Sequence, residues 1–368
     1  MMPVLPEIPV VYFHSVGIKS KLWPKNFLTS SVEDTERFFM HISGEYNSIS
    51  LREYYNQKNR LSPAVRNPIV ITFDDGYLDN WLFAFPLLKK YSLKATIFIS
   101  PEFVDKRRVV RDDPSENGFL SWDEMKIMEA SGLVDIQSHT LTHTKYFVSD
   151  KMTGFHHPGN DILYPAGNLL PERKPYYIDD QDFEKILPYG YPLFEEESAV
   201  TARKVTISQD FINEAVALLR TYDFKKYSFG DAFSRVRPLY DKFRKEDRII
   251  AAREGEAEYL KRIDEEITGS KTIIEKELEK KVEFLCWPHG DNNSFLHKKA
   301  LDGGYMMTSR GKAIISSDEE ASRIPERLGV VYTNPRRRFV TRFKIKAFSG
   351  TFPFRALVFL ARYFKRTP

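Results

Sequence analysis

Two carboxylates stand side by side at Asp74 and Asp75, directly after the apolar segment 68–73 and directly before Gly76. Adjacent carboxylates repel each other, so keeping both ionised requires a cation or strong hydrogen-bond donors nearby. An ordinary turn is the alternative, because Asp-Gly is a common loop sequence. The pair therefore predicts either a cation-dependent site or a plain turn.

A second polar cluster, "SHTLTH", places His139 and His143 four residues apart after another apolar segment. On a helical turn this spacing would put both imidazoles on one face, close enough to share one ion. Two histidines and one carboxylate would leave a coordination position for water, which is typical of a catalytic zinc. The other aspartate would then be free to take a proton from that water. A structural or fortuitous histidine pair is the alternative.

Apolar segments alternate with helical patterns over the first 150 residues. This pattern would place the aspartate and histidine clusters at the ends of strands in one sheet. We predict strands at 9–16, 68–73, 94–100 and 133–139, and helices from about Ser31, over 78–91 and over 121–132. This alternation predicts a parallel sheet with crossover helices, open or closed into a barrel. Sites in such folds assemble at the carboxyl ends of the strands, where both polar clusters stand.

Residues 150–205 break this rhythm. They are rich in Pro, Gly, Tyr and Asn and have no clear period, which predicts a functional loop or an insertion. Further along we predict helices at 209–222 and 292–304, a long charged helix over 254–282 with a break near Gly269, and strands at 283–288 and 305–309.

The composition is that of a folded globular protein. The 368 residues are 42% hydrophobic and 14% aromatic, and the single cysteine, Cys286, excludes an intrachain disulfide and a cysteine metal cluster. Neither a signal peptide nor an apolar run of about 18 residues is present, so we expect a cytoplasmic protein without a membrane-spanning helix.

Positive charge is concentrated at the C-terminus. Residues 336–368 contain ten Lys/Arg and no Asp or Glu, whereas the rest of the chain carries a net charge of −6. Basic residues interleaved with Phe, Leu and Val predict peripheral association with an anionic membrane surface. The alternative is a C-terminal helix packed on the domain. Nucleic acid is not expected as a partner, because no binding motif accompanies the basic residues.

The ordered motifs "TFDDG", "SHTLTH" and "FLCWPHGDNN", together with the opening "IPVVYFHSVG", resemble the polysaccharide deacetylase (NodB-homology, carbohydrate esterase) family. The "WPHG" form is closest in style to the poly-N-acetylglucosamine deacetylase branch. The resemblance covers roughly residues 8–140 and 254–335. It implies an α/β fold, namely a distorted, incomplete (β/α) barrel with a large insertion.

The domain organisation expected from this resemblance has four parts. They are the first part of the barrel (1–149), an insertion that walls or covers the substrate groove (150–253), the second part of the barrel (254–335) and a basic, apolar tail (336–368).

The resemblance also implies roles for individual residues. Asp74 would be the catalytic base, and Asp75, His139 and His143 would hold a divalent metal, with Zn2+ as the first expectation and Co2+, Ni2+, Fe2+ or Mn2+ as alternatives. Substrate contacts are expected from Tyr77, Trp287, Pro288 and His289, although Trp287 could instead pack in the core.

Two catalytic features of the family are missing. Many members take their general acid from a C-terminal histidine, but this chain has none after residue 297, so His14 or His289 must serve, and we favour His14. The third-motif arginine that steadies the base is replaced by Cys286. Arg323 or Arg327 could substitute for it, but we expect both to form ordinary surface salt bridges.

By this resemblance the protein is a metal-dependent hydrolase that removes an acetyl group from an N-acetylated sugar, either a polysaccharide, an oligosaccharide or a lipid-linked precursor. Cell-surface polysaccharide biosynthesis would be its setting, and an acetylated carbohydrate its partner. The alternatives are a non-catalytic glycan-binding or assembly protein with a degenerate deacetylase fold, and a sugar O-acetyl esterase.

Overall fold

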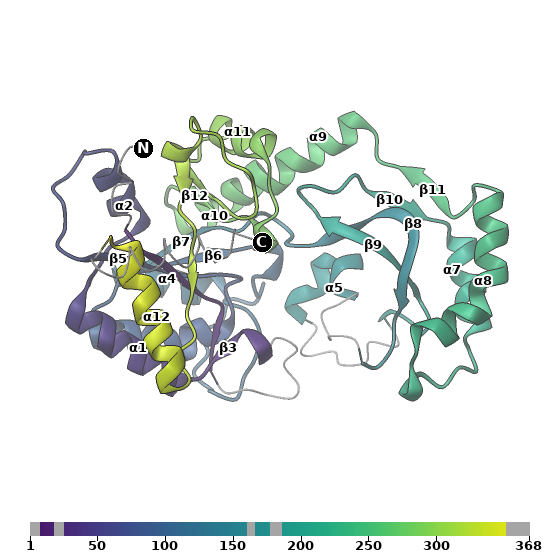
Figure 1. Cartoon of the computed structure of the whole chain (residues 1–368), viewed down its shortest axis with the longest axis horizontal. Helices are drawn as coiled ribbons and strands as arrows, with labels where there is room; N and C mark the ends of the chain where they lie inside the picture. Colours follow the sequence, from purple (N-terminus) through teal and green to yellow (C-terminus); the bar gives the residue numbers. More distant parts are fainter. Residues whose placement is uncertain (1–7, 18–25, 160–165, 177–185, 351–368) are drawn as a thin grey trace, which may run out of the picture.

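A parallel nine-stranded sheet forms the centre of the larger lobe (Figure 1). The computed structural model describes residues 8–17, 26–159, 166–176 and 186–350. Strands run in the order β14-β13-β12-β7-β6-β5-β1-β15, with β4 also paired to β5. Their bounds are β1 Val10–Phe13, β4 Asn47–Ser48, β5 Pro68–Phe73, β6 Ala95–Ile99, β7 Val134–Ser138, β12 Phe284–Leu285, β13 Met307–Ser309, β14 Arg323–Ile324 and β15 Leu328–Gly329. The four strands predicted in the first 150 residues are all present.

The two edge strands of this sheet follow each other in the chain. β14 ends at Ile324 and β15 begins at Leu328, so residues 325–327 connect opposite edges of the sheet. The four residue steps from Ile324 to Leu328 reach at most about 14 Å when fully extended. The sheet must therefore curl until its edges nearly meet, and the predicted fold class, an incomplete (β/α) barrel, is confirmed.

Strand register brings the predicted site residues to one level. β1 and β5 pair in parallel with Phe13 opposite Phe73, so the next residues, His14 and Asp74, leave the sheet side by side. On the other side of β6, Ile99 lies opposite Ser138, and His139 follows at the end of β7. A short parallel pair, β2 (Ser15–Val16) with β3 (Thr29–Ser30), extends the first strand beyond this edge.

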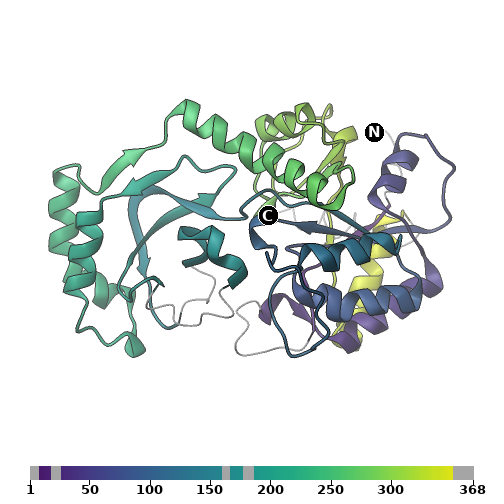
Figure 2. The same cartoon turned by 180° about the vertical axis from the view of Figure 1, so that it is seen from behind.

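Helices surround the curled sheet (Figures 1 and 2). They are α1 Val32–Glu45, α2 Leu51–Lys58, α3 Phe85–Tyr91, α4 Trp122–Ala130, α10 Ser270–Leu278, α11 Ser294–Asp302 and α12 Pro335–Phe348. Ser31 caps α1, and Ser50 and Ser121 form capping boxes at the starts of α2 and α4, which fixes these N-termini. A π-helical turn, Asn80–Ala84, precedes α3 within the predicted helix 78–91.

The second lobe has a hydrophobic cluster of its own, formed by residues between Met152 and Ile249. Its elements are β8 Lys145–Phe155, α5 Ala166–Leu169, β9 Pro192–Ser198, β10 Val205–Ile207, α7 Gln209–Leu218, α8 Phe229–Lys245 and β11 Ile250–Arg253. β8 pairs with β9 and β10 with β11, both antiparallel. The domain boundaries at 149/150 and 253/254 remain predictions.

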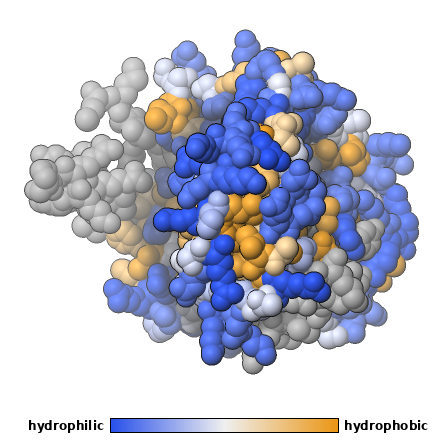
Figure 3. All heavy atoms as spheres, turned by 90° about the vertical axis from the view of Figure 1, so that its right-hand side faces the viewer, coloured by the Kyte–Doolittle hydropathy of each residue, from blue (hydrophilic) through white to orange (hydrophobic). Residues whose placement is uncertain are grey.

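Residues 150–205 are not simply a loop, because β9 lies within them and β8 extends into them as far as Phe155. The alternative of an insertion remains a prediction. The first six residues of β8 are all half-buried, so the strand lacks the alternation that would reveal it in sequence. Helix α8 was not predicted either. At the end of this lobe that carries α7 and α8, the surface is largely hydrophilic with an apolar area near its centre (Figure 3).

The chain returns to the barrel through a long helical segment. α9 (Glu256–Asp264), a π-helical turn (Glu265–Gly269) and α10 follow without interruption, so the predicted helix over 254–282 has a π turn where we expected a break.

The described part of the basic tail is helix α12. Ile345 of this helix belongs to the main hydrophobic cluster, as the alternative of a packed C-terminal helix requires. Residues 351–368, which hold most of the tail's apolar run, lie outside the described residues. Over the described ranges, every helix is too short or too polar to cross a bilayer.

Candidate active site

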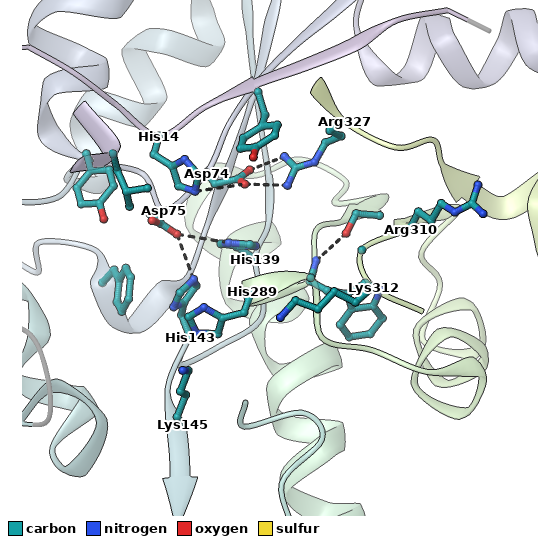
Figure 4. A pocket seen from close by; sticks show the side chains of 18 of the residues that line it. His14, Asp74, Asp75, His139, His143, Lys145, His289, Arg310, Lys312 and Arg327 are labelled. Carbon is teal, nitrogen blue, oxygen red and sulfur yellow. Dashed lines mark hydrogen bonds and ion pairs between the residues drawn. The ribbon is translucent and has the colours of Figure 1, made fainter. Parts of the chain in front are cut away.

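The turn after β5 directs its two carboxylates to different partners. Asp75 and Gly76 both have left-handed backbone conformations, with φ of 73° and 66°. A Cβ atom on Gly76 would lie 2.7 Å from Cγ2 of Ile99, so only glycine fits. As Figure 4 shows, the side chain of Asp74 faces Arg327, whereas that of Asp75 faces the two predicted histidine ligands. Each carboxylate thus has its own partners, which an ordinary turn would not require.

Asp75, His139 and His143 form a buried group with the composition of a metal site. Oδ1 of Asp75 lies 3.4 Å from Nε2 of His139 and 3.2 Å from Nε2 of His143. Nevertheless this buried oxygen has no hydrogen-bond partner in the described part of the chain. Ligands about 2.1 Å from a tetrahedral zinc would be separated by about 3.4 Å, so the spacing fits one ion.

The ring nitrogen of His139 that faces away from Asp75 already forms a hydrogen bond. Its Nδ1 lies 2.7 Å from the backbone oxygen of Cys286, to which it donates a hydrogen bond in the tautomer that leaves Nε2 free as a ligand. Burial lowers the pKa of His143 to about 4 against the opposing charge of Asp75, so this imidazole is neutral, as a ligand must be. Burial would also lower the pKa of His139, but Cys286 and Asp75 outweigh burial and raise it, so His139 would release a proton when a metal binds. Burial would raise the pKa of Asp75, but the histidines outweigh it and hold the pKa well below its usual range.

The two histidines do not share a helical turn, contrary to the expectation from their spacing. Residues 139–143 form an irregular loop in which Thr140 and His143 have φ of 63° and 46°. The buried carboxylate of Glu266 accepts hydrogen bonds from the backbone N–H groups of Leu141 and Thr142, each 3.1 Å away. The loop is therefore held from the π-helical turn of a distant segment.

A lysine from the second lobe holds the same loop. Nζ of Lys174 donates to the backbone oxygens of Thr142 at 2.8 Å and His143 at 3.1 Å. Sequence reasoning missed both Glu266 and Lys174. Neither belongs to a recognisable motif, and only the folded chain brings them to the loop.

Arg327 binds the second carboxylate. Its two terminal nitrogens lie 2.7 Å and 2.8 Å from Oδ1 and Oδ2 of Asp74, and one of them is 2.9 Å from Sγ of Cys286. The expected surface salt bridge for Arg327 is therefore wrong, because only 14% of its side chain is exposed and its partner is buried. The guanidinium lies against Cys286, the position at which the resemblance lacks its arginine.

This contact decides the charge of Asp74. Burial would raise the pKa of the carboxyl, but the charge and hydrogen bonds of Arg327 outweigh burial and hold it below its ordinary value. A second group of potential ligand atoms, on Asp74, His139 and Cys286, is a poorer metal site, because Arg327 already occupies both oxygens of Asp74.

Arg323 does not reach the site. It is 1% exposed and binds Glu319 at 2.6 Å and Oδ1 of Asn292 at 2.8 Å. The expected surface salt bridge is wrong here too, because Arg323 is buried, although Glu319 is only half-buried.

The two candidate acids differ in position. Nε2 of His14 lies 3.9 Å from Oδ2 of Asp74, and 23% of the side chain is exposed toward the cavity. His289 lies against His143, with ring centroids 4.7 Å apart. Burial, assisted by the neighbouring His143 and by the positive charge of Lys145, lowers the pKa of His289 to about 2. A neutral imidazole holds its remaining N–H proton too tightly to act as a general acid near pH 7, so His289 is the poorer candidate for this role.

A cavity of about 590 Å³ opens onto these groups and is lined by residues from both lobes. Tyr77, Trp287 and His289 line it, as predicted for substrate contacts, whereas Pro288 is buried and is not among the lining residues. Trp287 is 1% exposed and belongs to the main hydrophobic cluster, so its ring fits the core alternative. The lining also includes cationic residues that sequence reasoning missed, namely Lys145, Lys174, Arg310 and Lys312.

Part of this chain is similar to one family of known proteins. Residues 62–158 match the family model described as polysaccharide deacetylase. YxkH of Bacillus subtilis (strain 168), provisionally named a polysaccharide deacetylase, is 29% identical over 138 residues. That alignment covers 37% of this chain and 43% of the relative, so this chain spans less than half of the relative's length.

Two solved structures share the fold over most of the chain. A de-N-acetylase from Aggregatibacter actinomycetemcomitans has a TM-score of 0.55 at 19% identity, covering 91% of this chain and 99% of the other. The BpsB deacetylase domain from Bordetella bronchiseptica has a TM-score of 0.51 at 17% identity, covering 87% and 95%. The structural likeness therefore extends well beyond residues 62–158.

Proposed function

We propose that this protein, of which residues 62–158 match the polysaccharide deacetylase family model, is a metal-dependent hydrolase that removes the acetyl group from an N-acetylated sugar. One observation carries the proposal. A buried, unpartnered carboxylate oxygen lies between two histidines, next to a second carboxylate held by Arg327, at the end of a cavity. The resemblance of "WPHG" to the poly-N-acetylglucosamine deacetylase branch favours an N-acetylhexosamine.

Asp75, His139 and His143 would hold the metal. Their one oxygen and two nitrogens suit zinc, with Co2+, Ni2+, Fe2+ or Mn2+ as alternatives. When bound, the ion supplies Lewis acidity, which lowers the pKa of water and polarises the acetyl carbonyl.

Asp74 would act as the general base. Its lowered pKa keeps it ionised at neutral pH, and Arg327 fixes its orientation while each oxygen retains a free lone pair. It would take a proton from the attacking water as the water oxygen bonds to the acetyl carbon.

His14 would act as the general acid. It stands 3.9 Å from Asp74 and can donate a proton to the sugar nitrogen as the carbon–nitrogen bond breaks. The products are acetate, which keeps the water oxygen, and a free amine. The backbone N–H of His289 is the candidate donor to the developing oxyanion.

Metal content and acetate release, measured together, test this function. The purified protein and an Asp74→Asn variant would be assayed on N-acetylated and O-acetylated sugars. Bound metal in both, with acetate released from N-acetylated sugars by the parent alone, is the expected result. Release from O-acetylated sugars only would identify an esterase. Bound metal and sugar binding without any release would identify a glycan-binding protein.

Cell-surface polysaccharide assembly is the proposed setting, with a membrane surface as a partner through residues 336–368. The full chain should co-sediment with vesicles containing anionic lipid and not with neutral vesicles, and a chain ending at Gly350 should lose this binding. Equal behaviour of the two chains would contradict a role for the last 18 residues.

A further inference from the structure

Strand β8 leads directly from the candidate metal site into the second lobe. Its first residue, Lys145, follows His143 by two positions, and Figure 4 shows it next to His143 and His289. Lys145 and Glu196 line the 590 Å³ cavity and also a second cavity of about 240 Å³. The two cavities therefore adjoin each other at this pair of side chains.

A polar bridge marks this junction. Phe147 of β8 pairs with Glu196 of β9, so Glu196 shares a face of the ribbon with Lys145, two residues before Phe147. Nζ of Lys145 lies 3.4 Å from Oε1 of Glu196, and Nδ2 of Asn168 donates to Oε2 at 3.2 Å. The two charged side chains are 30% and 32% exposed, so their polar atoms remain accessible to a ligand.

The second cavity combines aromatic and polar walls. Tyr146, Phe147 and Tyr191 are half-buried and line it. Exposed polar side chains of the β10–α7 region complete the lining, namely Lys204, Thr206 and Gln209. Aromatic rings suit the apolar face of a sugar ring, and amide, ammonium and hydroxyl groups suit its hydroxyls. The volume lies below the roughly 300–1,000 Å³ of pockets for drug-sized ligands, so it suits a single ring.

We propose that the β8–β9 ribbon continues the substrate groove from the candidate active site into this second cavity, where it binds a further sugar unit of an oligomeric substrate. The proposal rests on the proposed function and specifies its substrate class. The substrate is an oligosaccharide or polysaccharide, and a unit remote from the reacting N-acetyl group contributes binding energy through the second lobe.

A bulky substitution tests this assignment without removing any contact of the core. Thr206 is exposed on β10 and lines the second cavity, so Thr206→Trp would fill it. Ala251 is exposed on the neighbouring strand β11 and does not line it, so Ala251→Trp is the matched control. Parent and variants would be assayed on β-1,4- and β-1,6-linked N-acetylglucosamine oligomers and on the monosaccharide. Circular dichroism and thermal unfolding would verify that both variants fold.

For the parent we expect kcat/KM to be about tenfold higher for the longer oligomers than for the monosaccharide, as one or two additional hydrogen bonds to charged groups would produce. Thr206→Trp should abolish this preference through KM, and Ala251→Trp should keep it. Equal kcat/KM for all lengths in the parent, or equal length preference in both variants, would overturn the proposal.

Equilibrium binding to Asp74→Asn separates this proposal from the proposed function. Tighter binding of longer oligomers, lost on adding Thr206→Trp, would support the second cavity even if no acetate were released by the parent. Affinity independent of length, or unaffected by Thr206→Trp, would overturn the proposal even if the parent were an active deacetylase.

Discussion

Replacing Arg327 with alanine would leave the carboxylate of Asp74 buried without its counter-charge. Asp74 is 3% exposed, and the side chain of Arg327 is 14% exposed, so water can replace little of the lost interaction. Removing one partner of a buried ion pair costs about 3–5 kcal/mol, and the slight exposure of Arg327 favours the lower end, about 3 kcal/mol. Relief of that cost by protonation would raise the pKa of Asp74 by about two units, since one unit corresponds to about 1.36 kcal/mol.

The sign of the pH dependence follows from this change. In the parent the pKa of Asp74 is below its ordinary value, so its ionisation stabilises the folded state above that value, and this stability is lost as pH falls through the folded-state pKa. In Arg327→Ala burial would dominate and raise the pKa above its ordinary value. The variant should therefore lose stability as pH rises toward neutrality.

Urea unfolding between pH 4 and pH 8 would measure the free energy of unfolding. The rate of acetate release over the same range would report the ionisation of Asp74 as the general base. For Arg327→Ala we expect the acidic limb of the activity profile to move upward by about two pH units. Arg327→Lys keeps a positive charge but cannot bind both oxygens of Asp74, so its acidic limb should lie at a pH between those of Arg327→Ala and the parent.

Arg323→Ala is the matched control, because it also removes a buried arginine from an ion pair but does not touch Asp74. It should lose stability and keep the parent's pH profile. The reasoning about Arg327 would be refuted if Arg327→Ala had the acidic limb of the parent, or if both variants shifted it equally.

Three further predictions concern the metal, the turn and the barrel edge. Asp75→Ala should bind no zinc. Chelation should lower the melting temperature of the parent but not of this variant, because a metal at 100 times its Kd adds about 2.7 kcal/mol to the free energy of unfolding. Equal metal content in parent and variant would contradict this prediction. Gly76→Ala should lower the free energy of unfolding, measured in urea, by about 1–3 kcal/mol more than Gly132→Ala does. Both glycines have positive φ, but only a side chain at position 76 would clash, with Ile99. Equal losses in the two variants would show that the structure relaxes around the clash. Asp79 accepts hydrogen bonds from Ser15 and Val16 of β2 beyond the edge of the sheet. Burial raises the pKa of Asp79 to about 7, so its protonated form stabilises the folded state below about pH 4, and this contribution is lost as pH rises to 7. Asp79→Asn should remove that part of the pH dependence, and an unchanged stability profile would contradict the assignment.

The sequence anticipated the groups that end the strands. Asp74, Asp75, His139 and His143 follow strands that alternate with helices, and parallel pairing brings the carboxyl ends of such strands to one edge. These expectations depend on local patterns of apolar residues and on strand geometry. They needed no knowledge of contacts between distant segments.

The contacts that orient these groups were decided by the tertiary structure. Arg327 reaches Asp74 across 253 residues, and Glu266 holds Leu141 across 125 residues. No local pattern identifies such partners, because an arginine or glutamate in a charged segment has the same sequence environment whether it faces water or a buried carboxylate. Curling of the sheet brings Arg327, in the connection between the two edge strands, against Asp74 on β5. Sequence alone determined which groups could carry the chemistry, whereas packing determined which charges hold them in place.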